Sequence, residues 1–257
     1  MKSIFIGGKQ IGANALRIHI AEGFRPEFVV ANLDDSGCDT WHESLVRIAT
    51  EASLPVITGK KVRDPEIIQK TKDAAPDIIF CIGGTQIIPK EVLDIPRLGT
   101  LNIHPALLPK YRGRFSTAHA IFNGEEFTGA TVHWMDEGLD TGPIILQEEF
   151  PISETDTGRT VYDKFTETGT KLFREFLILL SSGEDIVATP QDESKATYYP
   201  KDMPGGGKID WSWDGPKINR FIRAMTFEPF PPPDLMIGDK KMLIIDEKYF
   251  TGFTSDA

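Results

Sequence analysis

Residues 102–113 read NIHPALLPKYRG, and the motif DTGP follows at residues 140–143. Residues i and i+2 of a strand lie on the same face, so a strand that ends here presents Asn102 and His104 together while Ile103 points into a packing layer. The proline after His104 and the loop that follows end the strand. Two neighbouring polar side chains on an otherwise apolar strand indicate a site at its carboxyl end.

Upstream of this stretch, short β-rich runs alternate with segments of helical spacing. The runs KSIFIGG, FVVANL, LPVIT and PDIIFCIGG are typical of buried strands. Their alternation with helices predicts an α/β fold, with a Rossmann-like, mostly parallel sheet and helices on both faces. Ligands collect at the carboxyl ends of such strands, where the Gly-Gly pairs at 7–8 and 83–84 fall, as do Asn102 and His104. We therefore expect three strand ends to face one crevice.

The second half of the chain changes in texture. Residues 160–183 carry the apolar spacing of a long amphipathic helix that ends at Gly183. From about residue 187 proline, glycine and charge become frequent, which predicts a linker, a further helix and a closing β-hairpin. We predict an N-terminal Rossmann-like domain over residues 1–190 and a linker, helix and reduced β extension over 191–257. The hairpin could pair with a second copy in a homodimer or be buried on its own domain.

The composition narrows the classes of function. Lys and Arg number 28 against 38 Asp and Glu, a net charge of −10. This balance disfavours a general grip on nucleic-acid phosphates and counts against tRNA. No cluster of His, Cys, Asp and Glu has metal-ligand spacing, and the longest apolar runs fall short of the roughly 20 residues of a membrane span. We expect a cytoplasmic protein whose cysteine thiols are reduced, without a metal and without a nucleic-acid or membrane partner.

The loop EGLDTGP supplies the best partner for His104, because Asp140 lies in it directly after another predicted strand. A neutral imidazole can take a proton at pH 7, and a nearby carboxylate orients it and stabilises its protonated form. The amide of Asn102 can donate to an oxygen that gains negative charge. With no Ser or Cys nucleophile alongside, these residues suit direct attack by a substrate's amine on an activated acyl carbon. His133, on the predicted strand that precedes this loop, is interpreted as structural.

The blocks NIHPALLPKYRG and TGATVHWMDEGLDTGPII together resemble the signature of the folate-dependent formyltransferase family, which uses N10-formyltetrahydrofolate. The resemblance runs from about residue 1 to residue 233. It implies that Asn102 holds the formyl oxygen, that His104 acts as general acid/base, and that Asp140 tunes His104 and helps proton transfer.

The segment TQIIPKEVL, at residues 85–93, is similar to the family's folate-binding segment. The resemblance implies that its backbone hydrogen-bonds the pterin beside apolar side chains, and that the loop at 138–142 closes the pocket. The folate-binding residues expected on this basis are Gln86, Ile87, Ile88, Leu93, Gly138, Leu139 and Gly142.

The tail KIDWSWDGPKINRFIRAMTFEPFP is similar to the region where methionyl-tRNA and sugar formyltransferases leave the catalytic domain, which disfavours the shorter phosphoribosylglycinamide enzymes. Only about 24 residues follow FPPP, too few for the basic β-barrel of the tRNA enzymes. With the negative net charge, this favours a sugar N-formyltransferase that acts on a nucleotide-linked deoxyamino sugar, as in O-antigen synthesis. The alternatives are a methionyl-tRNA or other amine formyltransferase, and a non-catalytic folate- or nucleotide-binding module.

A nucleotide-linked acceptor carries a pyrophosphate, which binds backbone amides and basic side chains. GGKQIG opens a helix after the first strand, and the family's RG loop borders the acceptor site. The alternatives are a simple tight turn for the first segment and a surface ion pair for the arginine of the second. Where many relatives have a proline shortly after RG, this chain has Ser116 and Thr117. The candidate acceptor-binding residues are Gly8, Lys9, Gln10, Arg112 and Arg114.

Overall fold

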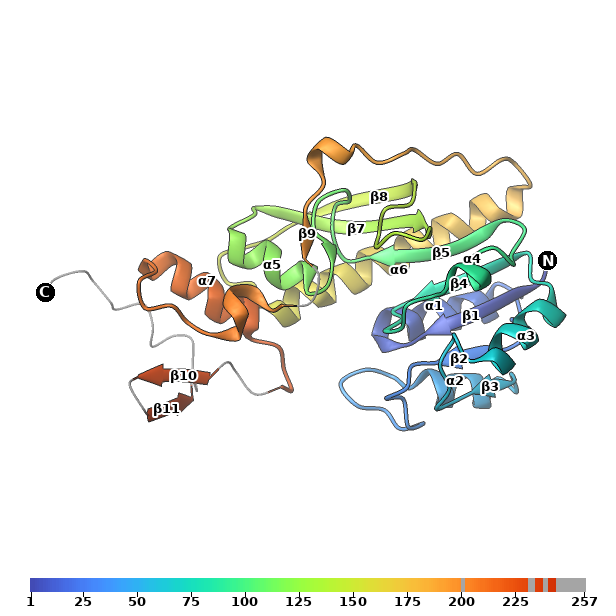
Figure 1. Ribbon diagram of the computed structural model, residues 1–257, viewed down its shortest axis with the longest axis horizontal. Coiled ribbons are helices and arrows are strands. Elements are labelled where there is room, and N and C mark those ends of the chain that lie inside the picture. The colour runs from blue at the N-terminus through green and yellow to red at the C-terminus, as the bar shows by residue number, and fades with distance from the viewer. Residues whose placement is uncertain (200–201, 231–233, 238–239, 244–257) are drawn as a thin grey trace, which may run out of the picture.

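A seven-stranded sheet forms the centre of this computed structural model, which describes residues 1–199, 202–230, 234–237 and 240–243. The strand order is β3-β2-β1-β4-β5-β7-β8 (Figure 1). The strands from β3 to β5 pair in parallel, whereas β5, β7 and β8 pair antiparallel. The strands span Ser3–Gly7 (β1), Val29–Ala31 (β2), Val56–Ile57 (β3), Ile78–Ile82 (β4), Gly99–His104 (β5), Phe127–Trp134 (β7) and Ile144–Pro151 (β8).

Helices cover both faces of this sheet, as expected for the α/β fold, which is confirmed. The helices are Lys9–Ala21 (α1), Leu45–Glu51 (α2), Pro65–Ala74 (α3), Lys90–Leu93 (α4), Ser116–Asn123 (α5), Gly158–Ser182 (α6) and Gly215–Met225 (α7). Two short 3₁₀ turns span Glu193–Lys195 (η1) and Pro204–Gly207 (η2), and the remaining strands are Arg112–Gly113 (β6), Tyr198–Tyr199 (β9), Asp234–Ile237 (β10) and Lys240–Leu243 (β11).

The two faces of the sheet are filled by alternate residues of the same strands. Phe5 and Phe80 pack in the cluster that includes side chains of α1, α2 and α6. Their neighbours Ile4 and Ile79 pack in a second cluster with side chains of α3 and α4. This alternation follows from the two-residue period of a strand, and burial on both faces explains why the runs read as continuously apolar.

The long helix α6 has clear start and stop signals. The Thr157 side chain accepts a hydrogen bond from the backbone N–H of Thr160, whose hydroxyl is bonded by the N–H of Thr157 in return. Gly183 caps the other end with φ 74°, a left-handed conformation that glycine adopts without strain. The predicted end of the helix at Gly183 is confirmed.

The carboxyl ends of β1, β4 and β5 lie side by side, because these strands are neighbours in the sheet. The backbone of Gly7 passes so close to β4 that an added Cβ would lie 1.9 Å from the carbonyl oxygen of Ile82. Gly83, at φ 64°, makes a similar approach to Gly8. The expected convergence of three strand ends on one edge is confirmed.

The chain after α6 runs back over β8 and β7 to β9 (Figure 1). Thr189 forms a β-bridge with Ile144, and β9 pairs in parallel with β6 beside the end of β5. Residues on both sides of the expected boundary at 190 therefore contact the sheet region, and the division into two domains stays a prediction.

The expected hairpin is represented by β10 and β11, which pair antiparallel. Its turn at residues 238–239 and the residues from 244 onward lie outside the described part, and pairing with a second copy stays a prediction. None of the helices in the described ranges is long and apolar enough to cross a membrane.

Candidate active site

His104 ends β5, and its imidazole is held at both nitrogens. Nε2 lies 2.8 Å from the carbonyl oxygen of Tyr111, so this nitrogen carries a hydrogen and donates it. Nδ1 faces Oδ2 of Asp140 at 3.4 Å, and the His104 side chain is 4% exposed. In the neutral ring Nδ1 is therefore the basic nitrogen, and a proton taken up there would lie between the imidazole and the Asp140 carboxylate, the arrangement that a general acid/base with an orienting partner requires.

Asp140 is held in a strained backbone conformation. Its φ is 56°, a left-handed value that few residues other than glycine adopt. Oδ2 accepts a hydrogen bond of 2.8 Å from the backbone N–H of Gly113. The next glycine, Gly142, passes so close to Trp134 that an added Cβ would lie 1.9 Å from its carbonyl oxygen. The loop is thus tied to the end of β7 and to the RG segment.

Asn102 lies directly opposite His133 in the antiparallel register of β5 and β7. Nδ1 of His133 donates to the carbonyl oxygen of Trp134 at 2.8 Å, so in the neutral ring Nε2 is an acceptor. Nδ2 of Asn102 donates to that Nε2 over 3.1 Å. Burial lowers the pKa of His133 to about 4, although the Asp140 carboxylate opposes the shift. A neutral His133 therefore fixes which way the Asn102 amide points.

His133 was expected to be structural, whereas the fold places it in the polar cluster with Asn102 and Asp140. Its Nε2 is 3.8 Å from Oδ1 of Asp140. Ser116 is a second unexpected neighbour: its hydroxyl lies 3.2 Å from Nε2 of His104 and its residue is buried. The signal for His133 was its position on the strand before DTGP, but only the register between β5 and β7 sets it opposite Asn102.

The expected folate-binding residues differ in how far their side chains are exposed at the edge beside this cluster. Ile87 is 86% exposed and Leu139 is 42% exposed, so both side chains are open to a ligand. A pocket of about 420 Å³ lies between α4 and the loop after β7. Its lining residues are Lys90, Leu93, Asp94, Met135, Asp136, Glu137 and Gly138.

Two members of the expected set face elsewhere. The side chain of Ile88 is buried in the core cluster that includes side chains of α3 and α4. Oε1 of Gln86 accepts from the backbone N–H of Val62 at 3.0 Å. The side chain of Ile88 and the amide oxygen of Gln86 therefore support the segment and are not available to a ligand.

Lys9 and Arg114 are brought together at the edge formed by the strand ends. Burial lowers the pKa of the Lys9 ammonium, the charge of Asp34 opposes this, and the charge of Arg114 adds to it. Over the described residues, no hydrogen bond or ion pair engages either side chain. Two nearby cations with no such contact favour an anion between them.

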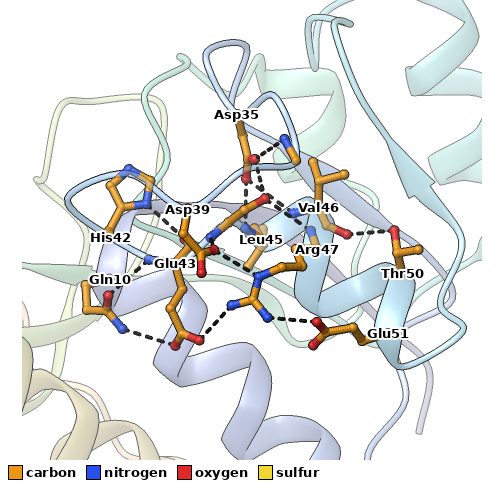
Figure 2. Close-up of polar contacts among 12 residues, drawn as sticks. Gln10, Asp35, Asp39, His42, Glu43, Leu45, Val46, Arg47, Thr50 and Glu51 are labelled. Carbon is orange, nitrogen blue, oxygen red and sulfur yellow. Dashed lines mark hydrogen bonds and ion pairs between the residues drawn. The ribbon is translucent and has the colours of Figure 1, made fainter.

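Arg112 and Gln10, expected at the acceptor site, are instead bonded to the protein. The guanidinium of Arg112 is buried, and four of its five N–H groups go to Gln191 and Glu193. Oε1 of Gln10 accepts from the backbone N–H of Glu43, and its Nε2 donates to the Glu43 carboxylate (Figure 2). Arg112 thus forms an ion pair, as in the alternative, but its guanidinium is buried and does not lie at the surface.

Gln10 thereby joins a polar network that orders the loop after β2 (Figure 2). The Asp35 carboxylate accepts from the Ser44 hydroxyl and from the backbone N–H groups at the start of α2. Arg47 bonds Asp39, Glu43 and Glu51. The loop is therefore held against α1, next to Lys9.

Comparison with known proteins identifies the family to which the chain is similar. The profile of the Formyl transferase family matches residues 28–177. A methionyl-tRNA formyltransferase of Citrifermentans bemidjiense is 35% identical over 247 residues, covering 95% of this chain and 77% of the relative. One of Geobacillus thermodenitrificans is 37% identical over 231 residues, covering 89% of this chain and 72% of the relative.

Solved structures agree on the fold. A sugar 3N-formyl transferase, crystallised in the presence of dTDP and 5-N-formyl-THF, superposes with a TM-score of 0.78 at 26% identity, covering 94% of this chain and 84% of that one. The N-formyltransferase from Helicobacter canadensis, in complex with folinic acid and dTDP-3-aminofucose, gives 0.75 at 27% identity, covering 94% and 86%.

These findings correct the expected acceptor. The sequence relatives at 32–37% identity are methionyl-tRNA formyltransferases, so the assignment as a sugar N-formyltransferase is wrong, and an O-antigen role is not supported. Net charge misled because it sums carboxylates wherever they lie, whereas binding depends on the local field. The count of residues after FPPP carries no weight against a likeness spread over 95% of the chain. The chain belongs to the Formyl transferase family and is an enzyme that transfers a formyl group.

Proposed function

We propose that this enzyme transfers the formyl group of N10-formyltetrahydrofolate to the amino group of methionyl-tRNA. The identity of 32–37% to methionyl-tRNA formyltransferases, over 89–97% of the chain, carries the proposal. The joining of Asn102, His104 and Asp140 at one strand end supports it, because amine formylation requires an oxyanion donor and a base without a protein nucleophile.

The residues at the edge of the sheet fit a folate. Exposed Ile87 and Leu139 offer apolar contact, and Leu93 and Gly138 line the adjoining pocket of about 420 Å³. A flat ring with polar edges suits apolar walls beside free backbone groups. Two structural relatives at 26–27% identity were solved with 5-N-formyl-THF or folinic acid. The folate supplies an activated formyl carbon and a nitrogen leaving group.

In the proposed chemistry the protein stabilises the negative charge that forms on the formyl oxygen and transfers one proton from the attacking amine. The Asn102 amide directs one N–H at His133, which leaves its second N–H to donate to the formyl oxygen as this oxygen becomes negative. Nδ1 of His104 takes the proton of the attacking amine, and the Asp140 carboxylate at 3.4 Å stabilises the resulting imidazolium. The same proton then passes to the leaving nitrogen, which returns His104 to its starting state.

The acceptor's phosphates would bind near Lys9 and Arg114. Both cations lie at the edge where the catalytic strand ends, and neither has a hydrogen bond or ion pair in the described part of the chain. A local pair of cations attracts a phosphate even when the whole protein is negative. We therefore still expect these two residues to bind the acceptor, with tRNA phosphates in place of a pyrophosphate.

The experiment is a formylation assay with N10-formyltetrahydrofolate and methionyl-tRNA, in which methionine released from the tRNA is weighed by mass spectrometry. We expect the mass of one added formyl group, absent with His104→Ala. Parallel reactions contain methionine alone and dTDP-linked amino sugars. Formylation of one of these compounds, with none on methionyl-tRNA, would overturn the proposal.

A further inference from the structure

Gln191 joins the segment after α6 to the loop that carries Asp140. Its Nε2 donates one hydrogen bond to the carbonyl oxygen of Asp140 at 2.8 Å and another to that of Gly142 at 2.7 Å. Its Oε1 accepts two from Arg112, at 3.1 Å from Nε and 2.8 Å from Nη2. The amide of Gln191 thus uses both of its N–H groups on the loop and its oxygen on the arginine.

The orientation of this amide is fixed by its partners. Carbonyl oxygens can only accept, and a guanidinium can only donate. The opposite orientation of the Gln191 amide would set its oxygen against the two carbonyls and its NH₂ group against Arg112, with every contact repulsive. Arg112 is itself anchored by the Glu193 carboxylate, at 2.9 and 2.6 Å.

The same segment also supports the other hold on Asp140. The N–H of Gly113 bonds the carboxylate, and Gly113 pairs with Tyr199 in the β6–β9 ladder. Residues 191–199 therefore act on Asp140 at two points: through Gln191 on its carbonyl and through Gly113 on its carboxylate. Asp140 has φ 56°, a left-handed conformation that costs a non-glycine residue some free energy, so contacts that hold the loop there stabilise it.

We propose that Gln191 is a positioning residue for formyl transfer, which holds the Asp140 loop so that the Asp140 carboxylate faces His104. The inference rests on the proposed function, in which Asp140 acts on His104. Arg112 locks the Gln191 amide and so contributes indirectly. This gives a catalytic purpose to a segment that the sequence pattern presented as a linker.

The discriminating variant is Gln191→Glu. It keeps the length of the side chain and strengthens the contact with Arg112, so the segment stays docked, but it removes both donors and sets a carboxylate against two carbonyl oxygens. We expect kcat to fall by about 10–100-fold, the loss typical of a small misplacement of a catalytic group, with the KM for the folate little changed. Gln69→Glu makes the same change on the exposed side of α3 and should leave kcat alone. Wild-type turnover by Gln191→Glu would overturn the proposal.

A double variant tests whether Gln191 acts through Asp140. Asp140→Asn removes the charge that the loop positions, so adding Gln191→Glu to it should lower kcat little further. Losses that multiply in full would show that Gln191 acts by another route, and would overturn the proposal.

Hydrogen exchange of the free protein separates this inference from the proposed function, because it needs neither donor nor acceptor. Backbone amides of residues 136–143 should exchange faster in Gln191→Glu, while those of β1 and β4 should not. Unchanged exchange in the loop would overturn the proposal that Gln191 holds it in position. If the wild-type protein does not formylate methionyl-tRNA, yet the loop exchanges faster in Gln191→Glu than in the wild type, the acceptor assignment is overturned and the positioning role of Gln191 is supported.

Discussion

Asn102 and His133 face each other across β5 and β7, and the amide of Asn102 donates to Nε2 of His133 over 3.1 Å. The bond depends on a neutral imidazole, which burial ensures by lowering the pKa of His133 to about 4. The amide that is proposed to stabilise the formyl oxygen is therefore held by a histidine that carries no charge at pH 7 and is itself fixed by the carbonyl of Trp134.

Replacing His133 should impair catalysis without abolishing it. His133→Leu removes the acceptor, so the Asn102 amide can rotate, and we expect kcat to fall by about tenfold or more. His19→Leu is the matched control, because His19 is also fully buried with a pKa lowered by burial to about 4, but it bonds Ser3 on β1. Steady-state kinetics of both variants would decide; equal losses in the two would refute a special role for His133.

Substitutions of His104 and Asp140 should lower kcat more than any of the other substitutions. His104→Ala removes the proposed base, and Asp140→Asn removes the charge that faces it, so each should lower kcat by about 10²–10⁴-fold. Folate binding, measured by titration with 5-formyltetrahydrofolate, should persist in both variants, because their side chains are not among the pocket residues. Near-normal turnover in either variant contradicts the proposed chemistry.

Much of the fold and part of this site follow from local sequence. The apolar runs and the residues between them are enough to predict alternating strands and helices, and the two-residue period of a strand groups Asn102 with His104. The contact of His104 with Asp140 was expected from the DTGP loop, and the structure shows it.

The rest depends on contacts between distant parts of the chain. The register of β5 and β7 brings in His133, and the return of residues 189–199 over the sheet brings in Gln191 and buries the guanidinium of Arg112. Neither the register nor this path leaves a periodic signal in the sequence. The acceptor was mistaken for a similar reason, because composition reports the total charge of a protein and not where its charges lie.

Removing the charge of Lys9 or Arg114 should weaken the binding of the acceptor and leave the binding of the folate unchanged. Lys9→Gln and Arg114→Gln should each raise the KM for methionyl-tRNA, leave the KM for the folate unchanged, and lower the salt slope of binding by about one. Arg97→Gln is the control, since Arg97 pairs with Asp77 at the amino end of β4, away from the site. A KM for methionyl-tRNA that is insensitive to both changes would refute phosphate contact here.

Acid should destabilise the protein through His19. Burial lowers its pKa from 6.5 to about 4, so between these values the unfolded chain binds more protons than the folded one. Stability therefore rises with pH across this window and is lost as the pH falls from 6.5 toward 4, by about 2 kcal/mol at pH 5. His19→Leu leaves the Ser3 hydroxyl without this partner, a cost that does not depend on pH, but removes the titration. Urea unfolding at pH 7.5 and 5 should thus show the free-energy gap between wild type and variant shrinking by about that amount at pH 5. A gap that is the same at both pH values would mean that His19 is protonated without cost in the folded state.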